Sequence, residues 1–231
     1  ICDDAMITFR SVLNFVNGYG MRWNTLERVQ SFTHPLWFFL LSANYFIWDE
    51  IFYSTIGLNL LLASAALWLL IHKLSVNVQV SITAVVILLF SKSFIDFSTS
   101  GLENALSYFL VALFCWLVLR EHQPKVIHLF YAMMVCCLLM LNRIDFVLLI
   151  FPALTYYAFS HFRFRQIIST GVIAFSPLMA WIVFSLIYYG YPFPNTAYAK
   201  LNTGIESQFL LLQGSHYFLN SLSWDTVTLV G

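Results

Sequence analysis

Two aspartates stand side by side near the start of the chain, in the stretch DDAMITF at residues 3–9. A carboxylate within hydrogen-bonding distance of a hydroxyl can take its proton while the hydroxyl attacks another atom, so Asp3 and Asp4 are candidates for a general base. The alternative is a helix cap, because an aspartate side chain accepts hydrogen bonds from the free N–H groups of a first turn. A cap explains one of the two carboxylates and does not require both.

Other charged residues occur in three short polar stretches that interrupt apolar runs. They are Glu103 in SGLEN (100–104), Arg143 and Asp145 in NRID (142–145), and Lys200 in YPFPNTAYAK (191–200). Arginine and lysine match a phosphate group and can hold the charge of a phosphate that leaves. Each residue also has a structural alternative. Glu103 would be favourable at the positive end of a helix, Arg143 and Asp145 could form an ion pair, and Lys200 could be a solvated charge.

The composition of the chain points to lipid surroundings. The 231 residues are 60% hydrophobic and 10% charged, with no net formal charge. Their mean hydropathy is +0.79. Apolar runs approach the ~20 residues needed to cross a bilayer, and no polar stretch is long enough for a separate soluble domain. The neutral overall charge argues against a nucleic-acid partner, since nothing resembles a basic stripe.

The elements that must position these residues are helices, and the predicted fold class is an all-α polytopic membrane protein. A short interfacial helix is expected over 4–16, and the apolar run 33–48 is too short to span and reads as interfacial or re-entrant. Six membrane-spanning helices are predicted at 51–72, 78–95, 104–119, 126–142, 145–161 and 166–189. The organisation is therefore an outer loop (1–50), six transmembrane helices (51–189) and a second outer loop (190–231). The chain starts without methionine and stops in a polar stretch, so we expect a fragment that lacks a first transmembrane helix and carboxy-terminal material.

The distribution of charge predicts which loops share a membrane face. The loops 72–73, 120–125 and 161–166 hold five basic residues (Lys73, Arg120, Lys125, Arg163 and Arg165) against one acid, Glu121. Basic residues on short loops mark the cytoplasmic side. The aspartate pair and all three polar stretches then meet on the outer face, which predicts a functional site there.

This outer face suits transfer from a lipid-linked donor. No Gly-rich phosphate cradle occurs, and the inward loops are too short for a nucleotide-binding domain, so a soluble nucleotide sugar is not the expected donor. The four cysteines show no spacing typical of a zinc site. No metal or other cofactor is predicted, although the paired aspartates leave a divalent cation as an alternative.

Several motifs together resemble a family of membrane enzymes. The matching elements are Asp3, Asp4 and Ala5; Arg10; Gly18 and Gly20; Trp23 and Asn24; Glu27, Arg28 and Val29; Thr33, Pro35, Leu36 and Trp37; TSGLEN (99–104) and YYGYPFPNTAYAKL (188–201), with a looser match at LNRID (141–145). In these motifs the chain resembles glycosyltransferases of the GT-C type. Its likeness is greatest to mycobacterial-type terminal arabinofuranosyltransferases and related bacterial pilin or envelope arabinosyltransferases.

The resemblance implies a GT-C-like transmembrane helix bundle in the bacterial inner (plasma) membrane, with its active site on the periplasmic or extracytoplasmic face. It implies a polyprenyl-phosphate sugar donor, a glycan or protein acceptor, and Asp3 or Asp4 as the catalytic base. Arg143 and Lys200 are candidates for the donor phosphate. Further candidates for sugar or acceptor contacts are Arg10, His34 and Glu103. Trp23 and Trp37 could stack on a sugar ring or anchor the chain at the interface.

Two other classes of protein fit parts of the pattern. A transporter or flippase for a lipid-linked precursor would also gather charges, but usually near the bilayer midplane and between internal repeats. A non-catalytic assembly subunit of an envelope complex is the second. Geometry separates them from a transferase, which needs its base and its phosphate-binding cations to line one cavity.

Overall fold

The computed structural model describes residues 1–120, 123–196, 198 and 206–224, and within these residues every regular element is a helix. The chain thus belongs to the all-α class, as the sequence predicts.

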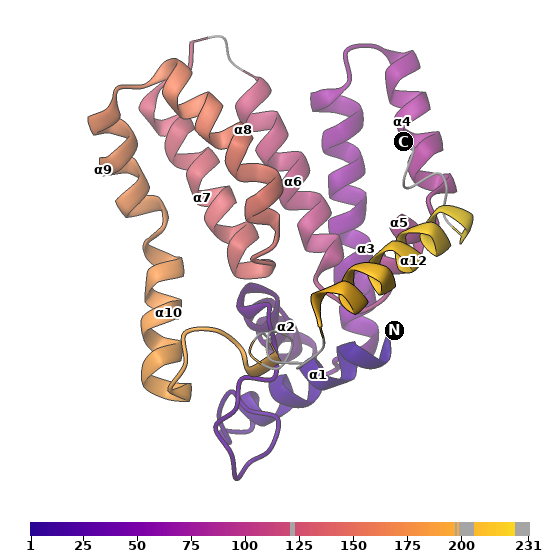
Figure 1. Ribbon diagram of the computed structural model, residues 1–231, viewed down its shortest axis with the longest axis vertical. Helices are drawn as coiled ribbons and strands as arrows, with labels where there is room; N and C mark the ends of the chain where they lie inside the picture. The colour runs from indigo at the N-terminus through magenta and orange to yellow at the C-terminus, as the bar shows by residue number, and fades with distance from the viewer. Residues whose placement is uncertain (121–122, 197, 199–205, 225–231) are drawn as a thin grey trace.

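Two helices from the amino-terminal segment lie across one end of a helix bundle (Figure 1). α1 (Asp3–Val16) buries Ala5, Phe9 and Val12, which recur at the spacing of one helix face. α2 (Pro35–Trp48) begins with a proline, whose missing N–H is not needed in a first turn. The helix predicted over 4–16 is therefore confirmed.

The bundle is built from apolar helices joined by short connections. They are α3 (Phe52–Leu69), α4 (Val78–Phe90), α5 (Lys92–Phe97), α6 (Asn104–Leu119), α7 (Val126–Asn142), α8 (Phe146–His161), α9 (Phe164–Ala174) and α10 (Ser176–Tyr189). A π-helical turn, η1 (Leu70–Leu74), extends α3. The helices predicted over 104–119 and 126–142 coincide with α6 and α7.

Two of the predicted helices are broken in the structure. The span predicted over 78–95 divides at Ser91, whose side chain accepts a hydrogen bond from the first turn of α5. The span predicted over 166–189 divides into α9 and α10, which meet at an angle of 47°. Pro177 cannot donate a backbone hydrogen bond to the carbonyl of Ile173, and the Ser176 hydroxyl donates to that carbonyl instead at 2.8 Å.

One hydrophobic core joins α1 and α2 to the bundle. α6 packs between α3 and α7, and α7 also packs against α8 and α9. Trp37 and Phe38 of α2 share a cluster of buried side chains with Leu106 of α6 and Leu139 of α7. The transverse pair of helices is therefore held firmly against the end of the bundle.

The length and composition of the helices bear on the membrane. One helix, Phe52–Leu74, has 23 residues and is long and apolar enough to cross a bilayer, and the bent pair α9 and α10 makes a second if it counts as one span. The other apolar helices, α2, α4, α6, α7 and α8, have 13–17 residues, fewer than the ~20 of an ideal span. The chain is thus all-helical with one or two candidate membrane spans among the residues described.

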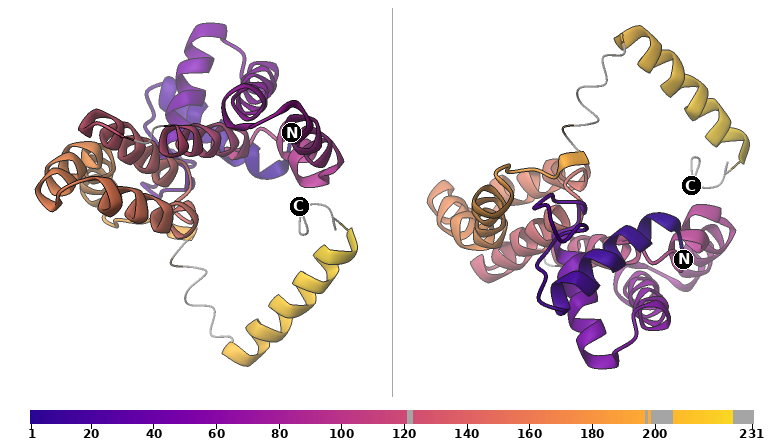
Figure 2. Two further views of the ribbon diagram at one scale, coloured as in Figure 1. Left: turned by 90° about the horizontal axis from the view of Figure 1, so that it is seen from above. Right: turned by 90° about the horizontal axis from the view of Figure 1, so that it is seen from below.

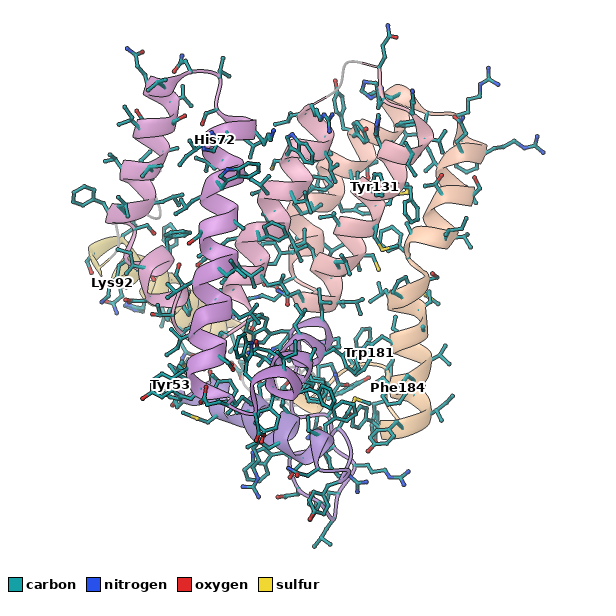
Figure 3. The ribbon with its side chains drawn as sticks, turned by 180° about the vertical axis from the view of Figure 1, so that it is seen from behind. Tyr53, His72, Lys92, Tyr131, Trp181 and Phe184 are labelled. Carbon is teal, nitrogen blue, oxygen red and sulfur yellow. The ribbon has the colours of Figure 1, made fainter. Side chains whose placement is uncertain are left out.

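The connections alternate between the two ends of the bundle. The α3–α4 and α8–α9 connections and the facing ends of α6 and α7 lie at the end opposite α1 and α2 (Figure 1). Figure 3 labels His72 at that end, whereas Trp181 and Phe184 lie at the level of α2. The basic loops predicted to face the cytoplasm thus share one end. The membrane side to which that end belongs stays a prediction.

A helix near the end of the described chain was not predicted. α12 (Ser207–Trp224) stands apart from the bundle (Figure 2), in a region expected to be an outer loop. The side chains of residues 208–220 are exposed along it. Its mixed apolar and uncharged polar sequence has no clear helical periodicity, which is why the sequence did not reveal it.

Candidate active site

A cavity of about 1030 Å³ opens where α1 and α2 meet the end of the bundle. Charged and polar side chains from four parts of the chain line it, among them Asp4, His34, Glu103, Arg143 and Asp145. Apolar side chains of α10 and the segment after it also line it, among them Leu178, Trp181, Ile182 and Phe193. The cavity is amphipathic.

The first turn of α1 separates the two aspartates. Asp4 lines the cavity. The Asp3 carboxylate instead accepts hydrogen bonds from the Cys2 thiol at 3.2 Å and the Asp4 backbone N–H at 3.1 Å. These hydrogen bonds, that of the thiol foremost, lower the pKa of Asp3. The bond from the Asp4 N–H is of the kind that the sequence left as a structural alternative, because that N–H is a free donor of the first turn of α1. The N-cap position itself is Cys2, which has no side-chain cap bond.

The turn at residues 100–103 carries Glu103 into the cavity and is held from four directions. Four consecutive backbone carbonyls accept hydrogen bonds: Ser100 from the Cys2 N–H (2.7 Å), Gly101 from Trp37 Nε1 (3.1 Å), Leu102 from Asn59 Nδ2 (3.4 Å) and Glu103 from Asn142 Nδ2 (3.0 Å). The donors belong to the start of α1 and to α2, α3 and α7. The position of the Glu103 backbone therefore depends on most of the fold.

Glu103 is a nearly buried carboxylate between two partners. Glu103 is 8% exposed. One oxygen, Oε2, lies 3.4 Å from His34 Nδ1, and the other, Oε1, lies 3.8 Å from a terminal nitrogen of Arg143. A carboxylate removed from water requires such partners.

His34 precedes α2 and is 7% exposed. Its Nε2 lies 2.9 Å from the hydroxyl of Thr8, which is itself 2% exposed. Burial lowers the pKa of His34, Glu103 opposes that shift and Arg143 adds to it. The imidazole is therefore neutral near pH 7. Nδ1 lies 3.4 Å from the Thr33 hydroxyl as well as 3.4 Å from the Glu103 carboxylate. A proton on Nδ1 leaves Nε2 to accept from the Thr8 hydroxyl.

Arg143 caps the carboxyl end of α7 in an extended conformation. Its guanidinium donates two hydrogen bonds to Asp145, from Nε at 3.1 Å and from a terminal nitrogen at 2.8 Å, and a third to Asn104 Oδ1 at 3.1 Å. The bond to Asp145 raises the pKa of Arg143. The ion pair that the sequence left as a structural alternative is thus present. The guanidinium also lines the cavity with its side chain 37% exposed, so it can still meet a ligand.

Three predicted contacts fall outside the cavity or outside the described residues. Arg10 does not line the cavity, and its guanidinium lies over the ring of Trp23 at 4.1 Å. Trp37 is fully buried and donates to the Gly101 carbonyl, so it presents no face for stacking on a sugar. Lys200 lies outside the described residues.

Other cavity residues were not singled out from the sequence. Thr8 follows Asp4 by one helical turn, and this spacing could have placed it on the same face. Asn104 directly follows Glu103 and binds Arg143. Trp181 gave no usable signal, because it lies inside an apolar run where aromatic residues are common.

Cys2, Asp3 and Asp4 bring one potential ligand atom each to within 4.8 Å of one another. A divalent cation could be held there, and the sequence left that alternative open at the paired aspartates.

Comparison of the chain with protein-family models, with curated proteins and with solved structures finds no match.

Proposed function

We propose that the chain is a membrane glycosyltransferase that moves a sugar from a polyprenyl-monophosphate donor to a hydroxyl of an envelope glycan or protein. The observation that carries the proposal is one cavity lined both by Asp4, Glu103 and Arg143 and by apolar side chains of α10. The sugar is proposed as arabinofuranose on the motif resemblance alone.

The outer surface of the bundle supports a polytopic membrane arrangement. Leu61 of α3 is 66% exposed, Leu148 of α8 is 81% exposed and Ile187 of α10 is 80% exposed. Apolar surface of this extent needs lipid or protein to cover it. Six crossings in a GT-C-like bundle would place this apolar surface in lipid. Helices shorter than the bilayer is thick can be accommodated by local thinning of the bilayer. The basic residues at the opposite end favour a site on the extracytoplasmic face of the inner membrane.

The amphipathic lining supports a lipid-linked donor. Leu178, Trp181 and Ile182 follow one another at helical spacing and present one face of α10 to the cavity. An isoprenoid chain could lie along this face while its phosphate meets the guanidinium of Arg143. A donor with both an apolar tail and an anionic head fits such a site better than a soluble one.

The proposed reaction uses Asp4 as general base. The acceptor hydroxyl gives its proton to Asp4 as its oxygen bonds to the first carbon of the sugar. The bond from that carbon to the phosphate oxygen breaks, and polyprenyl phosphate leaves with the electron pair. Arg143 stabilises the negative charge that develops on the phosphate.

The test is sugar transfer by membranes that contain the full chain or its Asp4→Asn variant. The assay supplies a short-chain polyprenyl-phosphoryl arabinofuranose and an arabinoside acceptor, and mass spectrometry detects the product. We expect Asp4→Asn to lower the rate by about 10²-fold to 10⁴-fold, the usual contribution of a general base.

Asp3→Asn is the matched control, because it makes the same chemical change one residue away and outside the cavity lining. We expect it to lower the rate by far less. Equal rates for Asp4→Asn and the unaltered chain would contradict the assignment of the base. Movement of the labelled donor across the membrane without any transfer would favour the flippase alternative.

A further inference from the structure

The proposed reaction leaves one buried polar cluster without a role. Thr8, His34 and Glu103 are linked through the two nitrogens of the imidazole, and each residue is more than nine-tenths buried. Burial of polar groups is unfavourable unless they are paired, so such a cluster implies a requirement for a specific geometry.

We propose that His34 is a positioning residue that restrains the Glu103 carboxylate and thereby keeps Arg143 available to an anionic ligand. His34 would act through Glu103 and would not itself bind the substrate. The inference rests on the proposed function only for the identity of the ligand, a lipid phosphodiester.

The geometry at Glu103 shows what the restraint does. Oε2 faces His34 at 3.4 Å, so only Oε1 is turned toward Arg143, at 3.8 Å. That distance is too long for a hydrogen bond. Without the imidazole, both oxygens could close on the guanidinium and form the bidentate pair that carboxylates prefer.

The remaining N–H donors of Arg143 are the groups that would bind the anionic ligand. A guanidinium has five N–H donors. Three of them bond to Asp145 and Asn104, so two are left for a ligand as far as the described residues are concerned. A Glu103 carboxylate released from His34 would compete for these two donors and would also neutralise the charge.

Two substitutions separate the contacts of the imidazole. His34→Asn places a side-chain amide near the position of Nδ1 and can keep the contact with Glu103. His34→Gln places its amide near the position of Nε2 and can reach Thr8 but not Glu103. The probe is farnesyl methyl phosphate, a phosphodiester with an isoprenoid tail, and its Kd is measured by calorimetry on the full chain in detergent.

We expect the Kd to rise by about tenfold in His34→Gln, which corresponds to the loss of one favourable interaction. In His34→Asn we expect a change of less than about twofold. Wild-type affinity in His34→Gln would overturn the inference. Equal weakening in both variants, in step with equal losses of unfolding temperature, would also overturn it, because that result is expected of a purely structural histidine.

Repeating the test in a second variant, Glu103→Gln, makes it independent of folding defects. Glu103→Gln removes the competing negative charge, so the penalty of His34→Gln should disappear when the two changes are combined. A penalty that persists in the Glu103→Gln background contradicts the inference.

Arg143→Gln separates this inference from the proposed function. If Arg143→Gln weakens binding of the probe while His34→Gln does not, the inference alone fails. If Arg143→Gln leaves the Kd unchanged, the phosphate site is wrong and both proposals fail.

Discussion

Adjacent carboxylates acquire different roles from their directions on α1. Side chains of consecutive helical residues leave the axis about 100° apart, so Asp3 and Asp4 cannot face one cavity equally. Asp4 lines the cavity, and Asp3 turns to the Cys2 thiol. His34 shows the same dependence on surroundings, because burial and not sequence position determines its protonation.

The lowered pKa of His34 predicts how stability depends on pH. Between that lowered pKa and the ordinary value of 6.5, the unfolded chain binds a proton at this residue and the folded chain does not. The contribution to the free energy of unfolding is therefore complete above about pH 6.5 and is lost as the pH falls through the folded pKa.

We expect the unfolding temperature of the full chain to fall between about pH 6.5 and pH 5 more steeply than that of His34→Asn, which cannot titrate there. Unfolding temperatures in detergent, taken for both proteins over this range, provide the measurement. Parallel pH profiles would show that His34 does not change protonation on unfolding.

At the scale of the element, the turn at 100–103 needs a special backbone conformation to hold its place in the site. Gly101 has φ +82°, a conformation that residues with a side chain rarely adopt. A Cβ there would lie 3.1 Å from the Ala5 side chain and 3.2 Å from that of Ile1. The glycine thus allows α1, and with it Asp4, to approach the turn that carries Glu103.

Gly101→Ala and Gly18→Ala form a matched pair. Gly18 has φ +80° and nothing within 4 Å of an added Cβ, so its substitution introduces the backbone strain alone, about 1–2 kcal/mol. We expect Gly101→Ala to lower the free energy of unfolding by more than Gly18→Ala, because crowding against α1 is added to the strain. Denaturant titration in detergent measures both, and equal losses would exclude the close approach of α1.

At the scale of the whole molecule, the two ends of the bundle differ in charge and in content. One end carries the cavity with Asp4, Glu103 and Asp145, and the loops at the other end carry Lys73, Arg120, Lys125, Arg163 and Arg165. In a membrane this asymmetry predicts that the basic loops face the cytoplasm, because loops rich in lysine and arginine tend to stay there.

Cysteine labelling tests this orientation. Tyr19→Cys lies near the cavity end and Val76→Cys lies in the α3–α4 connection, at positions that are 57% and 91% exposed. In intact bacterial cells that express the chain with Cys2→Ser, we expect a membrane-impermeant maleimide to label position 19 and not position 76. Permeabilised cells should show both labels, and equal labelling of both positions in intact cells would contradict a membrane between the two ends.

Much of the helical organisation could be predicted from the sequence, because apolar runs between polar stretches are local features. The bounds of α6 and α7 follow from such runs alone. The break between α9 and α10 was missed, although Pro177 marks it, because the apolar run continues through it. α12 was missed because its apolar and polar residues follow no helical period.

The sequence by itself determined an all-helical apolar chain, the composition of its two sets of loops and the residues able to act as base or cation. Only the tertiary structure decided that Asp4 faces the cavity while Asp3 does not, and that Arg10 stays outside it. It also joined Thr8, His34, Glu103 and Arg143 in one chain of contacts. The reason is that residues 26 to 69 positions apart come within hydrogen-bonding or ion-pair distance only through helix packing, which no local pattern encodes.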